Sequence, residues 1–98
     1  YRVLAQGFRC PVGEIDLVAR RGGILAIVEV KHRDSLIAAG EAIGPRQQRR
    51  IRRAAEHFLQ RHPDLARLNL RFDAMLLVPR QLPRHLKGAW NADTLLPY

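Results

Sequence analysis

Two neighbouring stretches of the chain alternate aliphatic residues with charged ones. They cover residues 14–20 and 24–31 and are separated by a short segment that ends in the Gly-Gly pair at 22–23. Runs of β-branched and aliphatic residues favour strands, and Gly-Gly is a favoured hairpin loop. The pattern therefore predicts an antiparallel hairpin in which Arg21 faces Ile24.

Counting back from this loop places Asp16 opposite Glu29 and Glu14 opposite Lys31. Cross-strand partners have Cβ atoms about 4.5–5.5 Å apart, so facing carboxylates destabilise a sheet. A divalent cation would offset this cost, because Mg²⁺ prefers oxygen ligands and usually takes one or two protein carboxylates. Lys31 shares the face of Glu29 by the period-2 alternation of a strand. The alternative is a solvated carboxylate pair with Lys31 answering Glu14, and the spacing alone leaves both interpretations open.

The remaining pattern predicts a strand on each side of a long helix. A weak first strand covers 2–9, and a loop with a short helical turn at 36–39 follows the hairpin. A helix spans Pro45–Arg61, because proline suits a first helical turn and a second proline ends the segment. A buried strand covers 70–78, and a short one is compatible with 89–92. This order predicts an α/β fold with a mixed sheet and at least one covering helix.

The predicted helix has two different faces. Its apolar residues recur at the spacing of a core-facing stripe, which comprises Ile51, Ala54, Ala55, Phe58 and Leu59. Its arginines repeat on the opposite side, at Arg46, Arg49, Arg50 and Arg53. Such a stripe is most often a solvated helix face, but the shortage of acidic partners favours a surface that contacts phosphates.

Composition supports a small folded domain with an anionic partner. The chain has 98 residues, 47% of them apolar, which suits a single domain over 1–98. Seventeen basic against nine acidic residues give a net charge of +8, and all but Lys31 and Lys87 of the basic residues are Arg. The arginine fork suits phosphate, so nucleic acid is the first candidate. A high-GC codon bias accounts for much of the Arg/Lys ratio, but not for the sign of the charge.

Several protein classes are disfavoured. Cys10 has no second cysteine for a disulfide or a Cys/His zinc site, and the four histidines lack metal-ligand spacing. No apolar run reaches membrane length and no signal peptide is visible. We therefore expect a cytoplasmic enzyme or binding protein with no membrane partner. The chain begins inside a predicted strand without Met, so we expect further residues before Tyr1.

Four more polar residues have two interpretations each. Gln47 and Gln48 begin the helix on its apolar side, where their amides either point into a site or cap backbone groups. Asp73 interrupts an apolar strand, and an ion pair with a nearby arginine such as Arg71 is favoured over a metal role. For Glu14 a cross-strand salt bridge is favoured over a role as an outer metal ligand.

Four segments taken together resemble the bacterial YraN-like family of predicted endonucleases. They are GEIDLVA at 13–19, VEVK at 28–31, PRQQRRI at 45–51 and RFD at 71–73. The resemblance runs in the same order over about 1–78. That family is similar to the PD-(D/E)XK superfamily, which includes restriction endonucleases and archaeal Holliday-junction resolvases.

The resemblance implies a restriction-endonuclease-like fold and assigns roles to particular residues. The fold would be a mixed four- to five-stranded sheet flanked by helices. Asp16 and Glu29 would bind Mg²⁺ or Mn²⁺ together with the carbonyl of Val30, and Lys31 would be the catalytic lysine. Gln48, rather than its neighbour, matches the family's helix glutamine. The family's first helix, which carries an acidic residue, would precede the first residue of this chain.

The expected function is therefore metal-dependent hydrolysis of phosphodiesters in DNA, with branched or structured DNA suggested by analogy. The helix arginines listed above would hold the backbone without reading sequence. One alternative is a nucleic-acid-binding module with the same fold but no turnover. Another is an RNA-binding partner protein with a structural carboxylate pair. A homodimer would be compatible with a resolvase-like enzyme.

Overall fold

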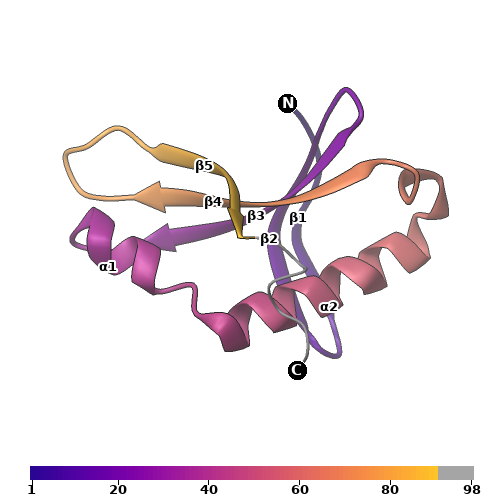
Figure 1. Ribbon diagram of the computed structural model, residues 1–98, viewed down its shortest axis with the longest axis horizontal. Coiled ribbons are helices and arrows are strands. Elements are labelled where there is room, and N and C mark those ends of the chain that lie inside the picture. The colour runs from indigo at the N-terminus through magenta and orange to yellow at the C-terminus, as the bar shows by residue number, and fades with distance from the viewer. Residues whose placement is uncertain (91–98) are drawn as a thin grey trace.

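The computed structural model describes residues 1–90, which form a five-stranded mixed sheet with two helices on one face (Figure 1). The strands follow one another in the sheet in chain order, and only β3 and β4 are parallel neighbours. In chain order the elements are β1 (Arg2–Cys10), β2 (Gly13–Arg21), β3 (Ile24–His32), α1 (Leu36–Glu41), α2 (Pro45–Arg61), the 3-10 helix η1 (Pro63–Leu65), β4 (Asn69–Leu77) and β5 (Arg84–Trp90). Both helices lie in the crossover from β3 to β4, as a parallel pair requires. The α/β class and mixed sheet are confirmed and are compatible with a restriction-endonuclease-like fold.

Most element boundaries match the sequence pattern. The hairpin register is confirmed at its turn, where Arg21 pairs with Ile24 and Gly22 adopts a φ of 58°. Helix α2 has the predicted bounds. The last strand begins at Arg84, five residues before the expected 89–92, and positions 91 and 92 lie outside the described residues. Within the described part of the chain, no helix is both long and apolar enough to cross a membrane.

The main core lies between α2 and the helix-covered face of the sheet. The apolar stripe of α2 packs against strand residues such as Ile15, Val18 and Ile27, which are all fully buried. Phe58 contacts Phe8 edge-to-face, with ring centroids 5.2 Å apart. A smaller cluster packs α1 on β4, and Trp90 adjoins both clusters. This packing holds the N-terminal end of α2 beside β2 and β3 and so positions the site described below.

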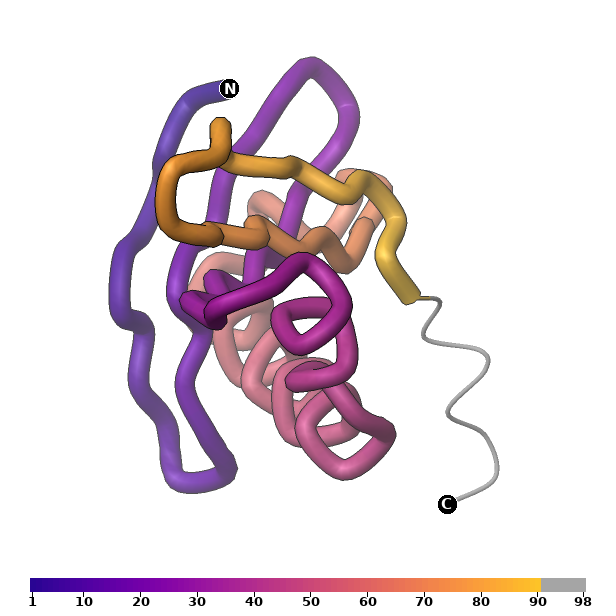
Figure 2. Tube along the Cα trace, turned by 90° about the vertical axis from the view of Figure 1, so that its left-hand side faces the viewer, coloured from indigo at the N-terminus to yellow at the C-terminus, as the bar shows by residue number. Residues whose placement is uncertain are grey.

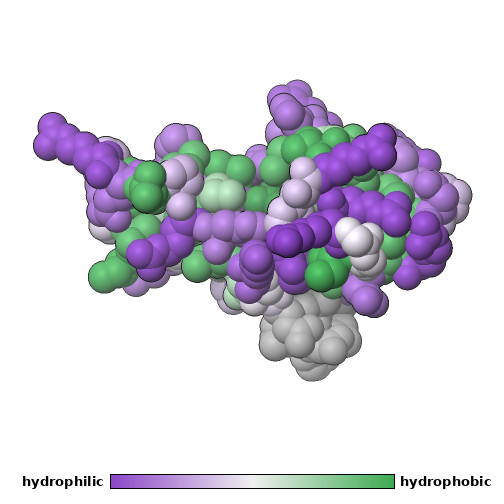
Figure 3. Space-filling view, turned by 90° about the horizontal axis from the view of Figure 1, so that it is seen from above, coloured by the Kyte–Doolittle hydropathy of each residue, from purple (hydrophilic) through white to green (hydrophobic). Residues whose placement is uncertain are grey.

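The other face of the sheet carries no helix in the described residues. Hydrophobic and hydrophilic side chains are interspersed across this face in Figure 3. Even so, Ala26 and Val28 of β3 and Asp73 of β4 are almost inaccessible there. Arg71 of β4 and His85 of β5 contact the Asp73 carboxylate on this face, and Tyr1 contacts Arg71.

Both edge strands are irregular. The β1–β2 register shifts between Val3 and Ala5, and Gly7 has a φ of 61°. The β4–β5 register shifts between Phe72 and Ala74, close to Gly88, whose φ is also 61°. These positive φ values are readily adopted only by glycine. Neither outer strand therefore presents a continuous straight edge.

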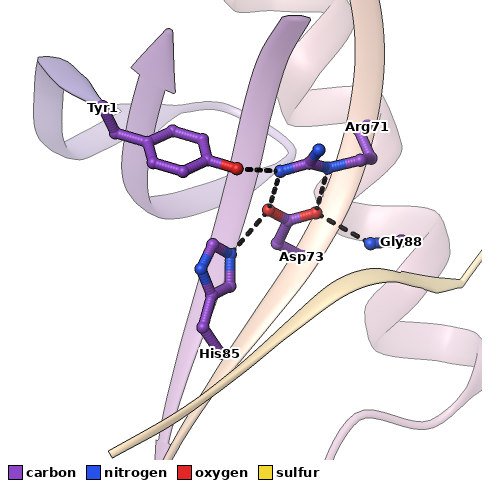
Figure 4. A network of polar contacts seen from close by, with 5 residues as sticks. All are labelled: Tyr1, Arg71, Asp73, His85 and Gly88. Atoms are coloured by element: carbon purple, nitrogen blue, oxygen red, sulfur yellow. Dashed lines mark hydrogen bonds and ion pairs between the residues drawn. The ribbon is translucent and has the colours of Figure 1, made fainter. Parts of the chain in front are cut away.

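A polar network around Asp73 joins three parts of the sheet (Figure 4). The buried carboxylate accepts two hydrogen bonds of 2.8 Å from Arg71 and one of 2.9 Å from the backbone N–H of Gly88. His85 Nε2 lies 2.8 Å from the same carboxylate, and Arg71 also donates to the Tyr1 hydroxyl at 2.6 Å. The expected ion pair between Asp73 and Arg71 is confirmed.

The network keeps Asp73 ionised in spite of its burial. Desolvation on its own would raise the pKa of the carboxyl group. Hydrogen bonds from Arg71, Gly88 and His85 outweigh this effect and lower the pKa of Asp73 below its ordinary value of 3.8. The charge is therefore stabilised in the folded state more than in the unfolded chain.

Replacing Asp73 with Asn should destabilise the fold by roughly 3–5 kcal/mol at pH 7, because Arg71 loses its buried counter-ion. Since the folded pKa is lowered, this stabilisation is present above the ordinary pKa of 3.8 and is lost as pH falls through the folded pKa. Urea unfolding from pH 7 down to about 3 should show the gap between wild type and Asp73→Asn narrowing. Asp64→Asn, at an exposed position, is the control and should match wild type. A gap that is independent of pH would contradict this account.

Candidate functional site

The site begins where β2 parts from β3. The paired residues of the two strands run from Arg21 and Ile24 to Leu17 and Val28 and end there. At the next position the Asp16 carboxylate, rather than a backbone carbonyl, accepts a 2.8 Å hydrogen bond from the N–H of Val30. The side chain thereby satisfies a strand N–H at the point where the ladder opens. This hydrogen bond engages one oxygen of the carboxylate, Oδ2.

Glu29 lies against Asp16, as the register predicts. It is only 6% exposed, and its carboxylate also lies 3.5 Å from Lys31 Nζ. Burial is the largest cause that raises the pKa of Glu29, and contact with the Asp16 carboxyl raises it further. Lys31 opposes both effects but does not cancel them, so the pKa rises from 4.5 to about 8. Near neutral pH the carboxylate pair therefore holds a proton unless another cation compensates its charge.

Asp16 and Glu29 open into a cleft of about 640 Å³ between the sheet and the beginning of α2. The other wall includes Gly44, Pro45 and Gln47, together with Ile51. Gly44 is the N-cap residue of α2 and makes no side-chain cap, so the first turn presents backbone N–H groups at this wall. The cleft thus places acidic groups opposite the positive end of a 17-residue helix dipole.

The structure brings together some of the predicted site residues and separates others. Lys31 and Val30 contact the carboxylates directly, the first by its ammonium group and the second by its N–H. Gln48 instead donates a 3.0 Å hydrogen bond to the carbonyl of Ile43, in the segment that joins α1 to α2. Gln47 is the glutamine that lines the cleft. The catalytic role predicted for Gln48 and the ligand role of the Val30 carbonyl stay predictions.

The four predicted arginines also differ in position. Arg46 and Arg50 line the cleft from α2. Arg53 is exposed but does not line it, and Arg49 is half-buried. The helix face is therefore divided, with two of its arginines placed beside the carboxylates.

The structure corrects the predicted pairing of Glu14. Glu14 does not pair with Lys31, because only residues 17–21 of β2 are paired with β3. It pairs with Arg9 of β1 instead, and the two side chains form a 3.7 Å salt bridge. Sequence reasoning missed Arg9, although the turn signal of Pro11 and Gly13 was sufficient to place the two residues side by side.

The carboxylate oxygens of Asp16 and Glu29 suit a hard divalent cation that takes only a few ligands from the protein. Within residues 1–90, no group of three or more His, Cys, Asp or Glu side chains is arranged to hold a metal. Mg²⁺ nevertheless needs only one or two carboxylates, since water and substrate phosphate complete its six ligands. Asp16 and Glu29 meet this requirement, and their mutual repulsion is what a cation would relieve.

Fold and site thus define an α/β protein with a paired-carboxylate cleft under an arginine-rich helix. The family model described as "Uncharacterised protein family UPF0102" matches residues 1–77, so the chain belongs to UPF0102. This is the YraN-like family named from the sequence.

Curated relatives support the same assignment. A UPF0102 protein of Parvibaculum lavamentivorans is 60% identical over 91 residues, which cover 93% of this chain and 68% of the relative. One from Bradyrhizobium sp. ORS 278 is 59% identical, over 95% of this chain and 66% of the relative. The chain therefore spans about two thirds of the length of these relatives.

The raised pKa of Glu29 predicts an unusual dependence of stability on pH in EDTA. The folded state keeps a proton that the unfolded chain releases near pH 4.5, so the contribution is complete below 4.5 and is lost as pH rises to about 8. The slope cannot exceed about 1.4 kcal/mol per pH unit for one proton. Urea unfolding should show that Glu29→Gln removes this slope, whereas Glu56→Gln, at an exposed position, retains it. Equal slopes in wild type and Glu29→Gln would refute the coupling.

Proposed function

We propose that this protein is a Mg²⁺- or Mn²⁺-dependent endonuclease that hydrolyses phosphodiester bonds in DNA. The observation that carries the proposal is the contact between two carboxylates, one of them almost fully buried, in an open cleft with a lysine 3.5 Å away. A purely structural role would not offset the electrostatic cost of placing these carboxylates together, whereas binding a cation and a phosphate would.

The charges around the cleft suit a phosphodiester substrate. The first turn of α2 offers backbone N–H groups, which favour a phosphate by hydrogen bonding and by the helix dipole. Arg46 and Arg50 add positive charge on the same wall. The chain as a whole carries a net charge of +8, which attracts a polyanion at long range.

Each residue of the site has a distinct part in this chemistry. When bound, the metal would polarise a phosphate oxygen and lower the pKa of an attacking water. Asp16 and Glu29 would hold it, and the Val30 N–H fixes the orientation of the Asp16 carboxylate. Lys31 would stabilise the negative charge that develops on the phosphate. Its position is set by the pairing of its ammonium group with Glu29.

Cleavage of a labelled DNA in Mn²⁺ should decrease by at least about a hundredfold in Glu29→Ala, in line with the loss of a principal electrostatic group. DNA binding in EDTA should persist in this variant, because the arginines are unchanged. Gel analysis of products and fluorescence anisotropy measure the two properties separately. Glu56→Ala, which lies on the exposed side of α2, serves as the control and should cut like wild type.

The assay should include the longer Parvibaculum relative, because this chain spans only part of it. If both proteins bind DNA but neither cuts DNA in Mg²⁺ or Mn²⁺, the endonuclease proposal fails. The alternative of a nucleic-acid-binding module with the same fold would then account for the basic cleft.

A further inference from the structure

A second cleft continues the first one toward the turn of the β1–β2 hairpin. It has a volume of about 550 Å³ and is lined by the turn residues 10–13 together with Arg9, Glu14 and Arg50. Gly13, Glu14 and Arg50 line both clefts. The two clefts adjoin where Gly13 approaches the backbone of Arg50, and we call the pair, from the carboxylates to the hairpin turn, the hairpin groove.

The hairpin groove exists because the two ladders of β2 have different lengths. Pairing with β3 ends at Leu17, whereas pairing with β1 continues to Gly13 and Cys10. The end of the hairpin thus extends beside α2, as Figure 2 shows, and Gly13 approaches the backbone of Arg50. One wall of the groove is this hairpin end, and the other is the first part of α2.

The charges in the groove follow a simple pattern. Arg9 and Arg50 are both exposed, and the Arg9 side chain is 83% accessible. Glu14 lines both clefts from β2, with its carboxylate 3.7 Å from Arg9. The groove therefore adds one arginine, Arg9, to those that line the carboxylate cleft, and Glu14 neutralises part of their charge.

We infer that the hairpin groove binds the sugar-phosphate backbone of a single nucleic-acid strand next to the bond that is cut, with phosphates at Arg50 and Arg9. This inference rests on the proposed function for its direction along the substrate. Each cleft has the volume of a small-molecule pocket. The hairpin end and α2 bound the groove on two sides, so one strand can lie along it, whereas a base-paired duplex would have to lie across the mouth. In this arrangement Glu14 opposes binding, because it competes with phosphate for Arg9.

The test measures binding of a fluorescent single-stranded oligodeoxythymidine in EDTA, where no cleavage occurs. Arg9→Gln and Arg50→Gln should each weaken binding roughly fivefold and lower the slope of log K against log salt by about 0.7, the value of one lost phosphate contact on a single strand. Arg84→Gln is the matched control. It removes the same charge from an exposed position on β5 and should change neither quantity.

Glu14→Gln should have the opposite effect and tighten binding by about twofold to fivefold at low salt, since it removes a competing carboxylate. A decrease in affinity would contradict the role given to Glu14. Thermal unfolding of each of these variants serves to check that it folds. The same oligonucleotide annealed to its complement should bind more weakly, and its affinity should not depend on Arg9.

The outcomes separate the groove from the proposed catalysis. If Arg9→Gln and Arg50→Gln behave like Arg84→Gln, the groove inference fails, even if the protein cuts DNA. Equal losses on duplex and single strand would also overturn it. If both variants lose affinity for the single strand but wild type never cuts, the groove stands and the endonuclease proposal falls.

Discussion

The site depends on one hydrogen bond, in which the Asp16 carboxylate accepts the N–H of Val30 at 2.8 Å. A strand that leaves its neighbour normally exposes an unpaired backbone N–H, which is costly if it is shielded from water. Here a side chain takes the place of the missing carbonyl. Because the side chain accepts this hydrogen bond, β2 can diverge from β3 while Asp16 stays beside Glu29. The groove beyond the carboxylate pair follows from this divergence.

The contact between Asp16 and Glu29 makes the folded state less stable than it would be without it. Glu29 is almost fully buried in the sheet, and its pKa rises because both burial and Asp16 disfavour its charge. Lys31 compensates only in part. Asp73, on the opposite face, is equally buried but is provided with four hydrogen-bond donors. The same chain therefore satisfies one buried acid fully and leaves another electrostatically strained, which is typical of a functional position.

Much of the fold could be predicted from local pattern. The Gly-Gly turn fixed the register at Arg21 and Ile24, and period-2 alternation then brought Asp16 and Glu29 together. The 3.6-residue periodicity and its flanking prolines located α2 at its observed bounds. In each case the signal lies within a few residues of the feature that it specifies.

The features that sequence reasoning missed depend on contacts between distant segments. The period-2 count along the hairpin places Glu14 opposite Lys31 only if β2 and β3 stay paired as far as Glu14. The actual partner of Glu14 is Arg9, because the strand is released at Asp16. The orientation of α2 on the sheet likewise decides which of its arginines reach the cleft. This orientation is a tertiary property that cannot be read from the helical periodicity. The beginning of β5 was missed because the strand is mostly exposed and its residues show no alternation of apolar and polar positions.

The two glycine kinks in the edge strands have a consequence for the behaviour of the protein in a crowded cell. A long straight outer strand is a template on which another sheet can add, and proteins commonly protect such edges with bends or irregularities. Gly7 and Gly88 break the run of extended backbone on β1 and β5, and the Gly88 N–H is already occupied by Asp73. The glycines therefore limit open-ended sheet growth along both outer strands.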